Sequence, residues 1–514
     1  MKNQNLKQSP AQLPRLARRL GVAAAIGLGL GGCAVGPNFK TPDAPVAAGN
    51  AYTPTALPTQ TASAPGVGGA AQHFAAGQDI PAQWWSVFHS PALDQLIRSA
   101  LAQSPSMAAA EASLREAQEN YKAEAGTLAY PAVTGQLGAT RAHESALTTG
   151  QPGGSVLNLY NASVNVSYSP DVFGLTGRTL ESAQAQVDYQ RMQVEATYLT
   201  LTANVVTTAI REASLRAQLK ATQEVLDALT KQTGLIDKQF QFGAIPRSTL
   251  LTQRTQLAQT AATVPPLEKA LAQTRHQLSV LAGQLPSEAG IPEFQLDALT
   301  LPQELPVSLP SELVRQRPDI RASEAQLHSA SALVGVATAN QYPQFTLSGS
   351  YGSQALTPSQ VFKSSNIIWS LGAGLTQPIF NGGALTAKRH AAEAAYDAAA
   401  AQYRVTLLNA FQNVADSLRA LDSDASTLKA QAEAEALASQ SLALATSQYK
   451  LGAISNLNLL DAERAYQETH ITLVQAQAAR YADTAALFQA LGGGWWNRGE
   501  LVQAQSTLPP AKTN

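Results

Sequence analysis

Cys33 is the only cysteine in the 514 residues of the chain, and its thiol is the side chain best suited to covalent modification. It follows Leu30-Gly31-Gly32, so two small residues separate it from a leucine. A thiol in this setting can be alkylated by a diacylglycerol group, and such a lipid holds a protein at a membrane surface without a spanning segment. A chain with one cysteine cannot form an internal disulfide. We therefore predict that Cys33 is a lipidation site.

The residues before Cys33 have the pattern of a signal peptide. The leader carries five cations and no acid: Lys2, Lys7, Arg15, Arg18 and Arg19. Residues 20–32 form an apolar stretch of about 13 residues. A bilayer span takes roughly 20 residues, but the shorter length suits a signal-peptide core. The segment resembles a bacterial lipobox; the alternative is an ordinary secretory signal that contains one cysteine. Ala34, where an Asp would signal inner-membrane retention, makes the outer membrane the default destination by resemblance.

The composition of the mature chain excludes several function classes. Removal of the five leader cations leaves 30 Lys+Arg against 36 Asp+Glu, so the net charge moves from −1 to −6. Without a basic patch there is no reason to expect nucleic-acid binding. The seven histidines are scattered and form no HExxH motif or paired ligand set, so we expect no metal, no cofactor and no enzyme activity. Asp422 and Asp424 lie close together in a helical stretch and are interpreted as a solvated face.

The sequence contains an internal duplication with a period of about 210 residues. Residues 239–251 read QFQFGAIPRSTLL and residues 448–460 read QYKLGAISNLNLL, an offset of 209. Tyr130-Pro131 matches Tyr342-Pro343 at an offset of 212. Five prolines between residues 284 and 310 indicate a non-helical linker between the copies. The period is far above the 20–50 residues of solenoid repeats, so two copies of one large unit are expected.

Each copy has the same predicted order of elements. Helices are expected to start at Ser90 and Ser104-Pro105 in copy one, and at Ser311 and Arg317-Pro318 in copy two. Apolar and polar residues then alternate, for example over 161–168 and 367–376, which predicts two strands within about 131–169 and two within about 343–377. This period is typical of membrane barrel strands, although a half-buried sheet of a soluble protein has it too.

Long helices follow the strands. No helix breaker occurs from Gly177 to Gly243 or from Gly383 to Gly452, about 66–69 residues each. Helices of this length need to pack along one another as coiled coils. A returning helix then runs to Gly283 in one copy and to Gly492 in the other; Pro265-Pro266 is expected to break or kink the first of these.

Strand number predicts an assembly. Two strands per copy give four per chain, but membranes admit only closed barrels and the smallest known type has about eight strands. Several chains should therefore contribute strands to one barrel, with their long helices continuing as a tube.

At this point the chain resembles the outer-membrane efflux channel lipoproteins of the NodT or OprM type, within the wider TolC-like family. Five segments in order carry the resemblance: Cys33 to Phe39 with Pro42; Trp84-Trp85 with Phe88, Leu93 and Leu96; Leu309 to Leu313 with Arg317-Pro318-Asp319-Ile320; Tyr449, Leu451-Gly452 and Leu457 to Ala462; and Leu491-Gly492-Gly493-Gly494-Trp495.

The resemblance implies the fold class: an α+β membrane protein with two internal repeats. A homotrimer would form a 12-stranded outer-membrane β-barrel, four strands per chain, continued by a long periplasmic α-helical barrel. The implied domains are 1–32, the signal peptide; 33–89, the lipidated N-terminal segment and equatorial region; 90–283, repeat 1; 284–310, the equatorial linker; 311–492, repeat 2; and 493–514, the C-terminal tail. The implied location is the outer membrane, held by lipid and by the barrel, with an extension into the periplasm.

The resemblance also implies a function and its residues. The channel is a passive conduit for drugs or toxic small molecules, working with a periplasmic adaptor and an inner-membrane pump, usually of the resistance-nodulation-division class. By match to the turn motif, Leu457 and Asp461 fall on the ring that closes the periplasmic tip. The adaptor would contact the helix tips, at Gly243, Ala244, Ile245, Gly452, Ala453 and Ile454. Two alternatives remain: an exit duct for type I protein secretion, and a structural coiled-coil lipoprotein without a pore. The exported compound is not specified by the sequence.

Overall fold

The computed structural model describes residues 34–43, 52–145, 152, 154–288 and 290–498. The predicted lipidation site, Cys33, and the predicted signal peptide, 1–32, lie outside the described residues. The rest forms two compact units, each built from both repeats. The first unit draws on the described residues of Met1–Thr41, Arg115–Tyr189 and Ser323–Tyr403, and the second on those of Pro42–Leu114, Gln190–Ala322 and Arg404–Asn514.

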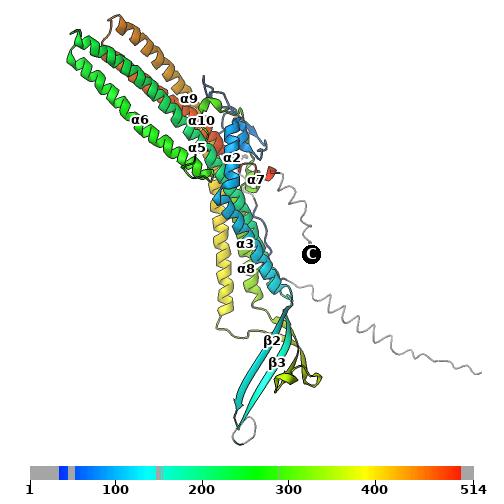
Figure 1. Ribbon diagram of the computed structural model, residues 1–514. Coiled ribbons are helices and arrows are strands. Elements are labelled where there is room, and N and C mark those ends of the chain that lie inside the picture. The colour runs from blue at the N-terminus through cyan, green and yellow to red at the C-terminus, as the bar shows by residue number, and fades with distance from the viewer. Residues whose placement is uncertain (1–33, 44–51, 146–151, 153, 289, 499–514) are drawn as a thin grey trace, which may run out of the picture. The chain divides into compact units, whose positions relative to one another are not determined.

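Helices form most of the chain (Figure 1). In order they are α2 Pro91–Gln103, α3 Pro105–Leu128, α5 Leu175–Gln241, α6 Arg247–Leu281, α7 Pro310–Gln316, α8 Pro318–Ala339, α9 Ala384–Lys450 and α10 Asn456–Ala490. The predicted starts at Ser90 and Ser104-Pro105 are confirmed: Ser90 caps α2, with the Leu93 N–H donating to its Oγ at 3.4 Å. In copy two the starts are Pro310 and Pro318, since proline fits the first helical position.

The duplication is visible in the lengths of the long helices. Both α5 and α9 have 67 residues, and both α6 and α10 have 35. Helices α9 and α10 begin 209 residues after α5 and α6, respectively. No helix within the described residues combines the length and the apolar character that a membrane crossing requires.

Of the break or kink expected at Pro265-Pro266, the break does not occur. Helix α6 continues through both prolines from Arg247 to Leu281. Two consecutive prolines remove two backbone donors, but a helix that packs along a neighbour is held by its side chains as well as by its own backbone bonds. Four residues of α6 before the prolines, Leu250, Gln253, Gln256 and Thr260, and three after them, Thr274, Leu278 and Ser279, are buried.

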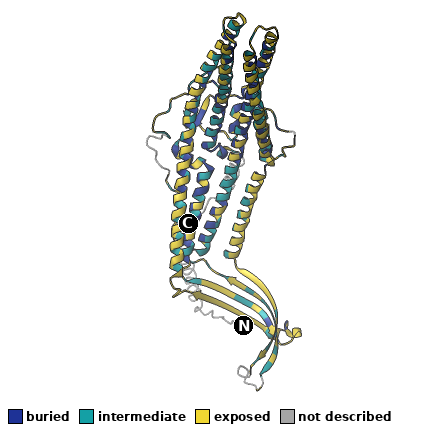
Figure 2. Cartoon of the chain, turned by 90° about the vertical axis from the view of Figure 1, so that its left-hand side faces the viewer, coloured by how far each residue is buried: buried dark blue, intermediate teal, exposed yellow. Residues whose placement is uncertain are grey.

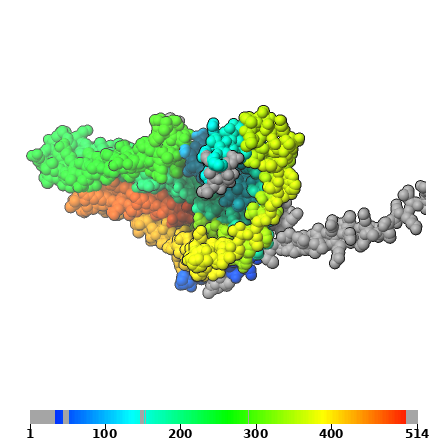
Figure 3. Space-filling view, turned by 90° about the horizontal axis from the view of Figure 1, so that it is seen from below, coloured from blue at the N-terminus to red at the C-terminus, as the bar shows by residue number. Residues whose placement is uncertain are grey.

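The first unit contains a four-stranded antiparallel sheet in the order β2-β3-β5-β6. The strands are β2 Ala132–Glu144, β3 Ser155–Tyr168, β5 Gln344–Ala355 and β6 Ile367–Thr376, so each repeat supplies one hairpin, as predicted. Figure 3 shows the sheet curving from the cyan β2–β3 hairpin to the yellow-green β5–β6 hairpin. Most strand residues are exposed (Figure 2), and every residue of β6 is.

The two faces of this sheet differ in polarity. Directly paired residues of antiparallel strands share a face, and one row of pairs joins Val164 to Tyr351 and Tyr351 to Trp369. The neighbouring row joins Ser163 to Gly352 and Gly352 to Ile368. Large apolar side chains lie exposed on the first face: Val133, Leu137, Val164, Val166, Leu347, Tyr351, Trp369, Leu371 and Leu375.

The second unit holds the main hydrophobic core. Trp84, Phe88 and Phe488 are fully or almost fully buried there, and the Trp84 and Phe488 rings stack at 5.6 Å. A short parallel pair, β1 His73–Ala76 and β4 Glu304–Val307, joins the N-terminal region to the inter-repeat segment. The Trp84-Trp85 motif therefore serves packing, because both rings are at most 2% exposed.

Candidate functional site: helix tips and the first turns of α10

The turn between α5 and α6 is a helix cap of the Schellman type. Gly243 has φ of 72°, a left-handed conformation that glycine adopts without steric cost. Its N–H donates to the Phe240 carbonyl at 2.9 Å, and the Ala244 N–H donates to the Gln239 carbonyl at 2.8 Å. These two bonds satisfy carbonyl groups that the end of the helix would otherwise leave unpaired. The sequence GAI is thus a helix terminator followed by the start of α6.

The turn between α9 and α10 repeats this geometry. Gly452 has φ of 73°, and its N–H donates to the Tyr449 carbonyl at 3.0 Å. The Ala453 N–H donates to the Gln448 carbonyl at 2.9 Å. Ile245 and Ile454 are half-buried at the equivalent positions of the two turns. All six residues predicted at the tips therefore lie in the two connecting turns of the second unit.

Each turn also presents an apolar side chain to solvent. Phe242 is 87% exposed and Leu451, its repeat equivalent, is 82% exposed. Sequence reasoning did not single out these two positions as a pair, although the residue directly before each GAI was available as a signal. The two turns thus expose an apolar side chain at the same position.

Leu457 and Asp461 lie on the first turns of α10, close to the tip. Ser455 caps this helix, with the Asn458 N–H donating to its Oγ at 3.3 Å. Leu457 is 56% exposed and the Asp461 side chain is 62% exposed. Since they are four residues apart on one helix, they share a face. The structure thus places both predicted gate residues on one exposed stripe.

Asp461 has a neighbour within its own chain. The Arg464 Nη1 lies 3.9 Å from the Asp461 Oδ1, at the limit of an ion pair, and both side chains are largely exposed. Arg464 makes its shorter bond elsewhere, from Nε to the Gln256 Oε1 on α6 at 2.6 Å. An exposed pair at this separation contributes little to stability. It therefore leaves the Asp461 carboxylate open to other interactions.

The start of α10 is held by its neighbours on the other side. The Asn456 Nδ2 donates to the Gln253 Oε1 on α6 at 3.2 Å, and Leu459 and Leu460 are buried. Farther along, the Thr472 Oγ1 donates to the Gln431 Oε1 on α9 at 3.0 Å. Because α10 is packed on these sides, Leu457 and Asp461 project from a fixed helix.

A groove of about 540 Å³ lies near the tips, between α5, α9 and α10. Its lining is mainly apolar and includes Leu229, Leu442 and Leu459. Burial raises the pKa of Glu463, which also lines the groove, to about 7. Sequence reasoning missed Glu463, although its place four residues after the buried Leu459, on the same helical stripe, was a signal.

A histidine links α9 and α10 beside this groove. The His470 Nδ1 lies 3.1 Å from the Glu435 Oε1, and the His470 ring stacks on that of Tyr466 with centroids 5.5 Å apart. The interaction joins residues 35 positions apart in sequence. Sequence reasoning counted His470 among the scattered histidines, since spacing alone does not reveal a contact between helices.

The second unit also has a buried polar network around Arg480 of α10. Its side chain is fully buried, and it donates to the Gly68 carbonyl at 3.0 Å, the Thr61 Oγ1 at 3.1 Å and the Gln72 Oε1 at 2.8 Å. These bonds fix the segment before β1 on α10. Nearby, burial and then the adjacent Asp424 raise the pKa of Asp483 to about 7. Asp424, which was expected on a solvated face, is half-buried and neighbours Asp483 of the adjacent helix.

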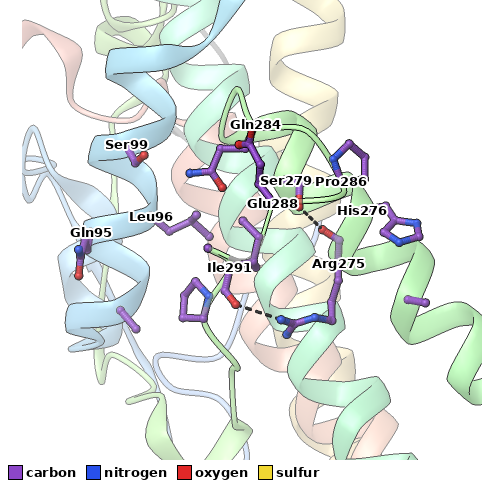
Figure 4. Close-up of a pocket in the computed structure, with 14 residues that line it drawn as sticks. Gln95, Leu96, Ser99, Arg275, His276, Ser279, Gln284, Pro286, Glu288 and Ile291 are labelled. Carbon is purple, nitrogen blue, oxygen red and sulfur yellow. Dashed lines mark hydrogen bonds between the residues drawn. The ribbon is translucent and has the colours of Figure 1, made fainter.

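A hollow of about 770 Å³ lies between α2, the end of α6 and the linker (Figure 4). Arg275 points into the linker there, donating from Nη2 to the Ile291 carbonyl at 3.0 Å and from Nη1 to the Glu212 Oε1 at 2.9 Å. Glu212 is fully buried on α5 and also accepts the Phe294 N–H at 3.1 Å. These contacts tie the linker to α5 and α6. Within the described residues no group of three or more His, Cys, Asp or Glu side chains is placed to hold a metal ion.

Comparison with known proteins identifies the family. The model of the outer membrane efflux protein family matches residues 96–284 and 309–493, one match per repeat. The chain is 30% identical over 491 residues to the probable efflux pump outer membrane protein TtgC of Pseudomonas putida, covering 94% of this chain and 97% of that protein. It is 29% identical over 486 residues to nodulation protein T of Rhizobium leguminosarum bv. viciae, covering 92% and 93%.

Solved structures agree in fold. The structure of the outer-membrane channel OprN superposes with a TM-score of 0.80 at 28% identity, covering 90% of this chain and all of that one. A crystal structure of CusC gives 0.77 at 25% identity, with coverage of 90% and 100%. The chain therefore belongs to the outer membrane efflux protein family: it is the outer-membrane channel of an efflux pump, extends into the periplasm, and is not an enzyme.

Proposed function

We propose that the chain works as a homotrimer whose three sheets close into one 12-stranded barrel. The single observation that carries this proposal is the four-stranded sheet with a polar face and an exposed apolar face. A spanning sheet needs every backbone group paired, and four strands are too few to close on themselves. Three copies supply enough strands, with the apolar face toward lipid and the polar face toward a lumen.

The cargo we propose is small, toxic organic compounds. Similar proteins are named for the efflux of toluene and of antibiotics: TtgC of another Pseudomonas putida strain and ArpC of Pseudomonas putida. A polar lumen suits passive passage of varied molecules. The energy for transport would come from an inner-membrane pump, which we propose to be of the resistance-nodulation-division class.

A periplasmic adaptor would bind the two helix tips. The support is the matched pair of exposed apolar residues, Phe242 and Leu451, beside the GAI turns. Expression with its pump and adaptor in a host that lacks its own channel should lower the accumulation of a fluorescent pump substrate. The double variant Phe242→Ser with Leu451→Ser should restore accumulation while leaving the amount of channel in the outer membrane unchanged. Low accumulation in both cases would exclude the tips as the adaptor site.

Leu457 and Asp461 would keep the periplasmic end closed at rest. Near a threefold axis, three Leu457 side chains form an apolar ring and three Asp461 carboxylates form a charged ring, which favours cations. The double variant Leu457→Ala with Asp461→Ala should raise single-channel conductance in planar bilayers and weaken cation preference. Unchanged conductance and selectivity would place the constriction elsewhere.

Cys33 would carry the lipid anchor of the mature chain. Cys33→Ser should abolish incorporation of labelled palmitate and the matching signal-peptide cleavage. Palmitate incorporation into the variant would show that the site is wrong. Because the barrel would itself span the membrane, we expect the variant to assemble less efficiently without losing all function.

A further inference from the structure

The loop between β5 and β6 folds back onto the apolar face of the sheet. The strand register joins Leu137 to Ala162, Ala162 to Ser353 and Ser353 to Ile367, so Ser353 belongs to the face that carries Leu137. Ser353 and Ala355 are 7% and 6% exposed, whereas the other described residues of the four strands are half-buried or exposed. The loop therefore covers the apolar face at this end of β5.

Hydrogen bonds hold the loop in this position. The Ser353 Oγ donates to the Asn366 carbonyl at 3.0 Å, which ties the loop to β5. The Asn366 Nδ2 donates to the Gln360 carbonyl at 2.9 Å, and the Lys363 N–H donates to the same carbonyl at 3.1 Å. Val361, between these residues, is only 7% exposed. The loop thus forms a fixed wall on the apolar face.

A hollow of about 620 Å³ lies between this wall and the sheet. Its lining is mainly apolar and includes Leu137, Val164, Tyr351, Phe362 and Ile367. Leu137 and Phe362 are 83% and 86% exposed, so the hollow opens on the surroundings of the sheet. The volume is within the range of small-molecule sites, about 300–1,000 Å³. A lining of this kind suits a hydrocarbon group.

Two cationic side chains accompany the hollow on this face. Side chains alternate along a strand, so Arg141 of β2 shares the face of Leu137, four residues earlier. Lys363 follows Phe362 in the loop, and both cations are exposed. Glu144, on the other face of β2, is the only acid in the two hairpins from β2 to β3 and from β5 to β6. This part of the apolar face therefore has a positive charge.

The cations lie toward the end of the sheet that is farthest from the helices. Strand β2 begins after α3 and β3 ends before α5, so the turn between them is at the opposite end, as is the loop between β5 and β6 (Figure 1). Because the channel extends into the periplasm, this end belongs at the outer surface of the membrane. At about 3.4 Å per residue, Arg141 lies about 14 Å beyond Leu137 in that direction. A cation on the lipid side of a barrel costs least near the membrane surface.

We propose that the hollow binds an acyl chain of a phosphorylated lipid of the outer leaflet, whose phosphate groups contact Arg141 and Lys363. The occupant is a lipid of the lipid A class, with several acyl chains and two phosphate groups on one headgroup. The proposal rests on the barrel proposed above, which turns the apolar face of the sheet toward lipid. It goes beyond that barrel by naming the lipid that one part of the face selects.

Charge complementarity favours this occupant over other lipids. A guanidinium binds phosphate through two parallel N–H bonds, and an ammonium binds it as a point charge. A lipid with two phosphates can therefore meet Arg141 and Lys363 together while its acyl chain fills the hollow. A zwitterionic phospholipid brings a cation of its own to the site, and a lipid without phosphate leaves both side chains without an anion.

Native mass spectrometry of the full-length protein in detergent, titrated with bisphosphorylated lipid A, tests the proposal. We expect one bound lipid per chain at saturation. The variant Arg141→Gln with Lys363→Gln should weaken this binding about tenfold, to the level seen with the same lipid after removal of its phosphates. The matched variant Arg115→Gln with Lys429→Gln removes an exposed Arg of α3 and an exposed Lys of α9, and should bind as the unsubstituted protein does.

A second variant tests the hollow separately from the charges. Ala162 lines the hollow, so Ala162→Phe places a ring inside it and should weaken binding of the phosphorylated and the dephosphorylated lipid alike. Ala373 pairs with Leu347 on the same face and is not part of the lining. Ala373→Phe therefore adds the same ring outside the hollow, and should leave binding unchanged. All variants are compared as complexes with the copy number of the unsubstituted protein.

Three results would overturn the proposed lipid site and leave the proposed barrel standing. They are equal binding of the phosphorylated and dephosphorylated lipids, equal binding of phosphatidylethanolamine, and undiminished binding by the Arg141 and Lys363 double variant. Absence of lipid A binding by a protein that remains trimeric has the same meaning. A protein that is monomeric and does not insert into lipid vesicles overturns the proposed barrel itself, on which the site depends.

Discussion

The returning helices α6 and α10 have the same length and follow the same kind of turn, yet their surroundings differ. Helix α10 contacts α5, α6 and α9 through hydrogen bonds, with Gln475 reaching Gln218 on α5 at 3.1 Å. It also begins with a side-chain cap from Ser455. Helix α6 has Pro246 at its cap position, with no side-chain cap bond, and contains two prolines. The second repeat therefore supplies the better-buried returning helix.

Local sequence therefore sets where these elements begin and end, while neighbouring helices set how far they are buried. Both GAI turns close with the same bonds because a Schellman cap depends on a few adjacent residues. Burial depends on which helices lie on either side, and within one chain repeat 2 has neighbours that repeat 1 lacks. In the sheet the asymmetry has the opposite direction: the turn after β3 of repeat 1 is covered, whereas the turn after β6 of repeat 2 is exposed.

The largest loss of unfolding free energy should come from removing the hydrogen bonds of Arg480, a residue whose equivalent in repeat 1 is apolar. Position 271, equivalent to Arg480, is Leu271, which is half-buried. Arg480→Leu would leave the Gly68 carbonyl, Thr61 and Gln72 short of a donor in a buried site, so we expect a loss of roughly 3 kcal/mol in unfolding free energy. Denaturant unfolding followed by circular dichroism measures it, with Leu271→Ala as the control at the equivalent site. A loss at Arg480 no greater than at Leu271 would contradict the asymmetry.

A smaller loss of stability, equal in the two repeats, is expected when the turns at the tips are changed. Gly243→Val and Gly452→Val each force a β-branched residue into a left-handed conformation, at a cost of about 1–2 kcal/mol. Hydrogen exchange of the amides near each turn should show similar loss of protection, since both caps have the same geometry. Strongly unequal losses would mean that packing, rather than the local cap, fixes these turns.

The smallest effect is a pH dependence confined to the tip of repeat 2. A Glu463 pKa of about 7 means that the folded protein disfavours the ionised form. The contribution of protonated Glu463 to the unfolding free energy is complete below about pH 4.5 and is lost as pH rises through about 7. The tip should therefore open more readily at pH 8 than at pH 5. Glu463→Gln should flatten this difference and stabilise the tip at pH 8 by about 1 kcal/mol, a value discounted for partial exposure.

Hydrogen exchange at the two pH values, corrected for intrinsic rates, measures this effect. Glu468→Gln, at an exposed carboxylate of the same helix, is the matched control. The equivalent position in repeat 1 is Arg254, which pairs with Asp237 at 2.8 Å on the surface, so the tip between α5 and α6 should lack this pH response. If the pH dependence of exchange is unchanged in the Glu463 variant, burial of Glu463 does not control the opening of the tip.

Much of this fold follows from the sequence because its signals are local. Strand alternation, the proline starts of the short helices and the two GAI turns each depend on neighbouring residues, and the duplication supplies every signal twice. The continuity of α6 through Pro265-Pro266 did not follow, because packing outweighs the lost backbone bonds. Glu463, the Arg480 network and the Asp424–Asp483 contact were missed for a related reason: each depends on which helix lies opposite, and spacing within one helix does not specify that.

In the proposed trimer, one chain leaves its sheet and its repeat 1 flank incomplete until other copies cover them. Native mass spectrometry of the full-length protein, extracted from outer membranes in a mild detergent, tests it most directly. We expect a complex of three copies that dissociates only on denaturation. A stable monomer that retains its β-sheet content by circular dichroism would contradict it.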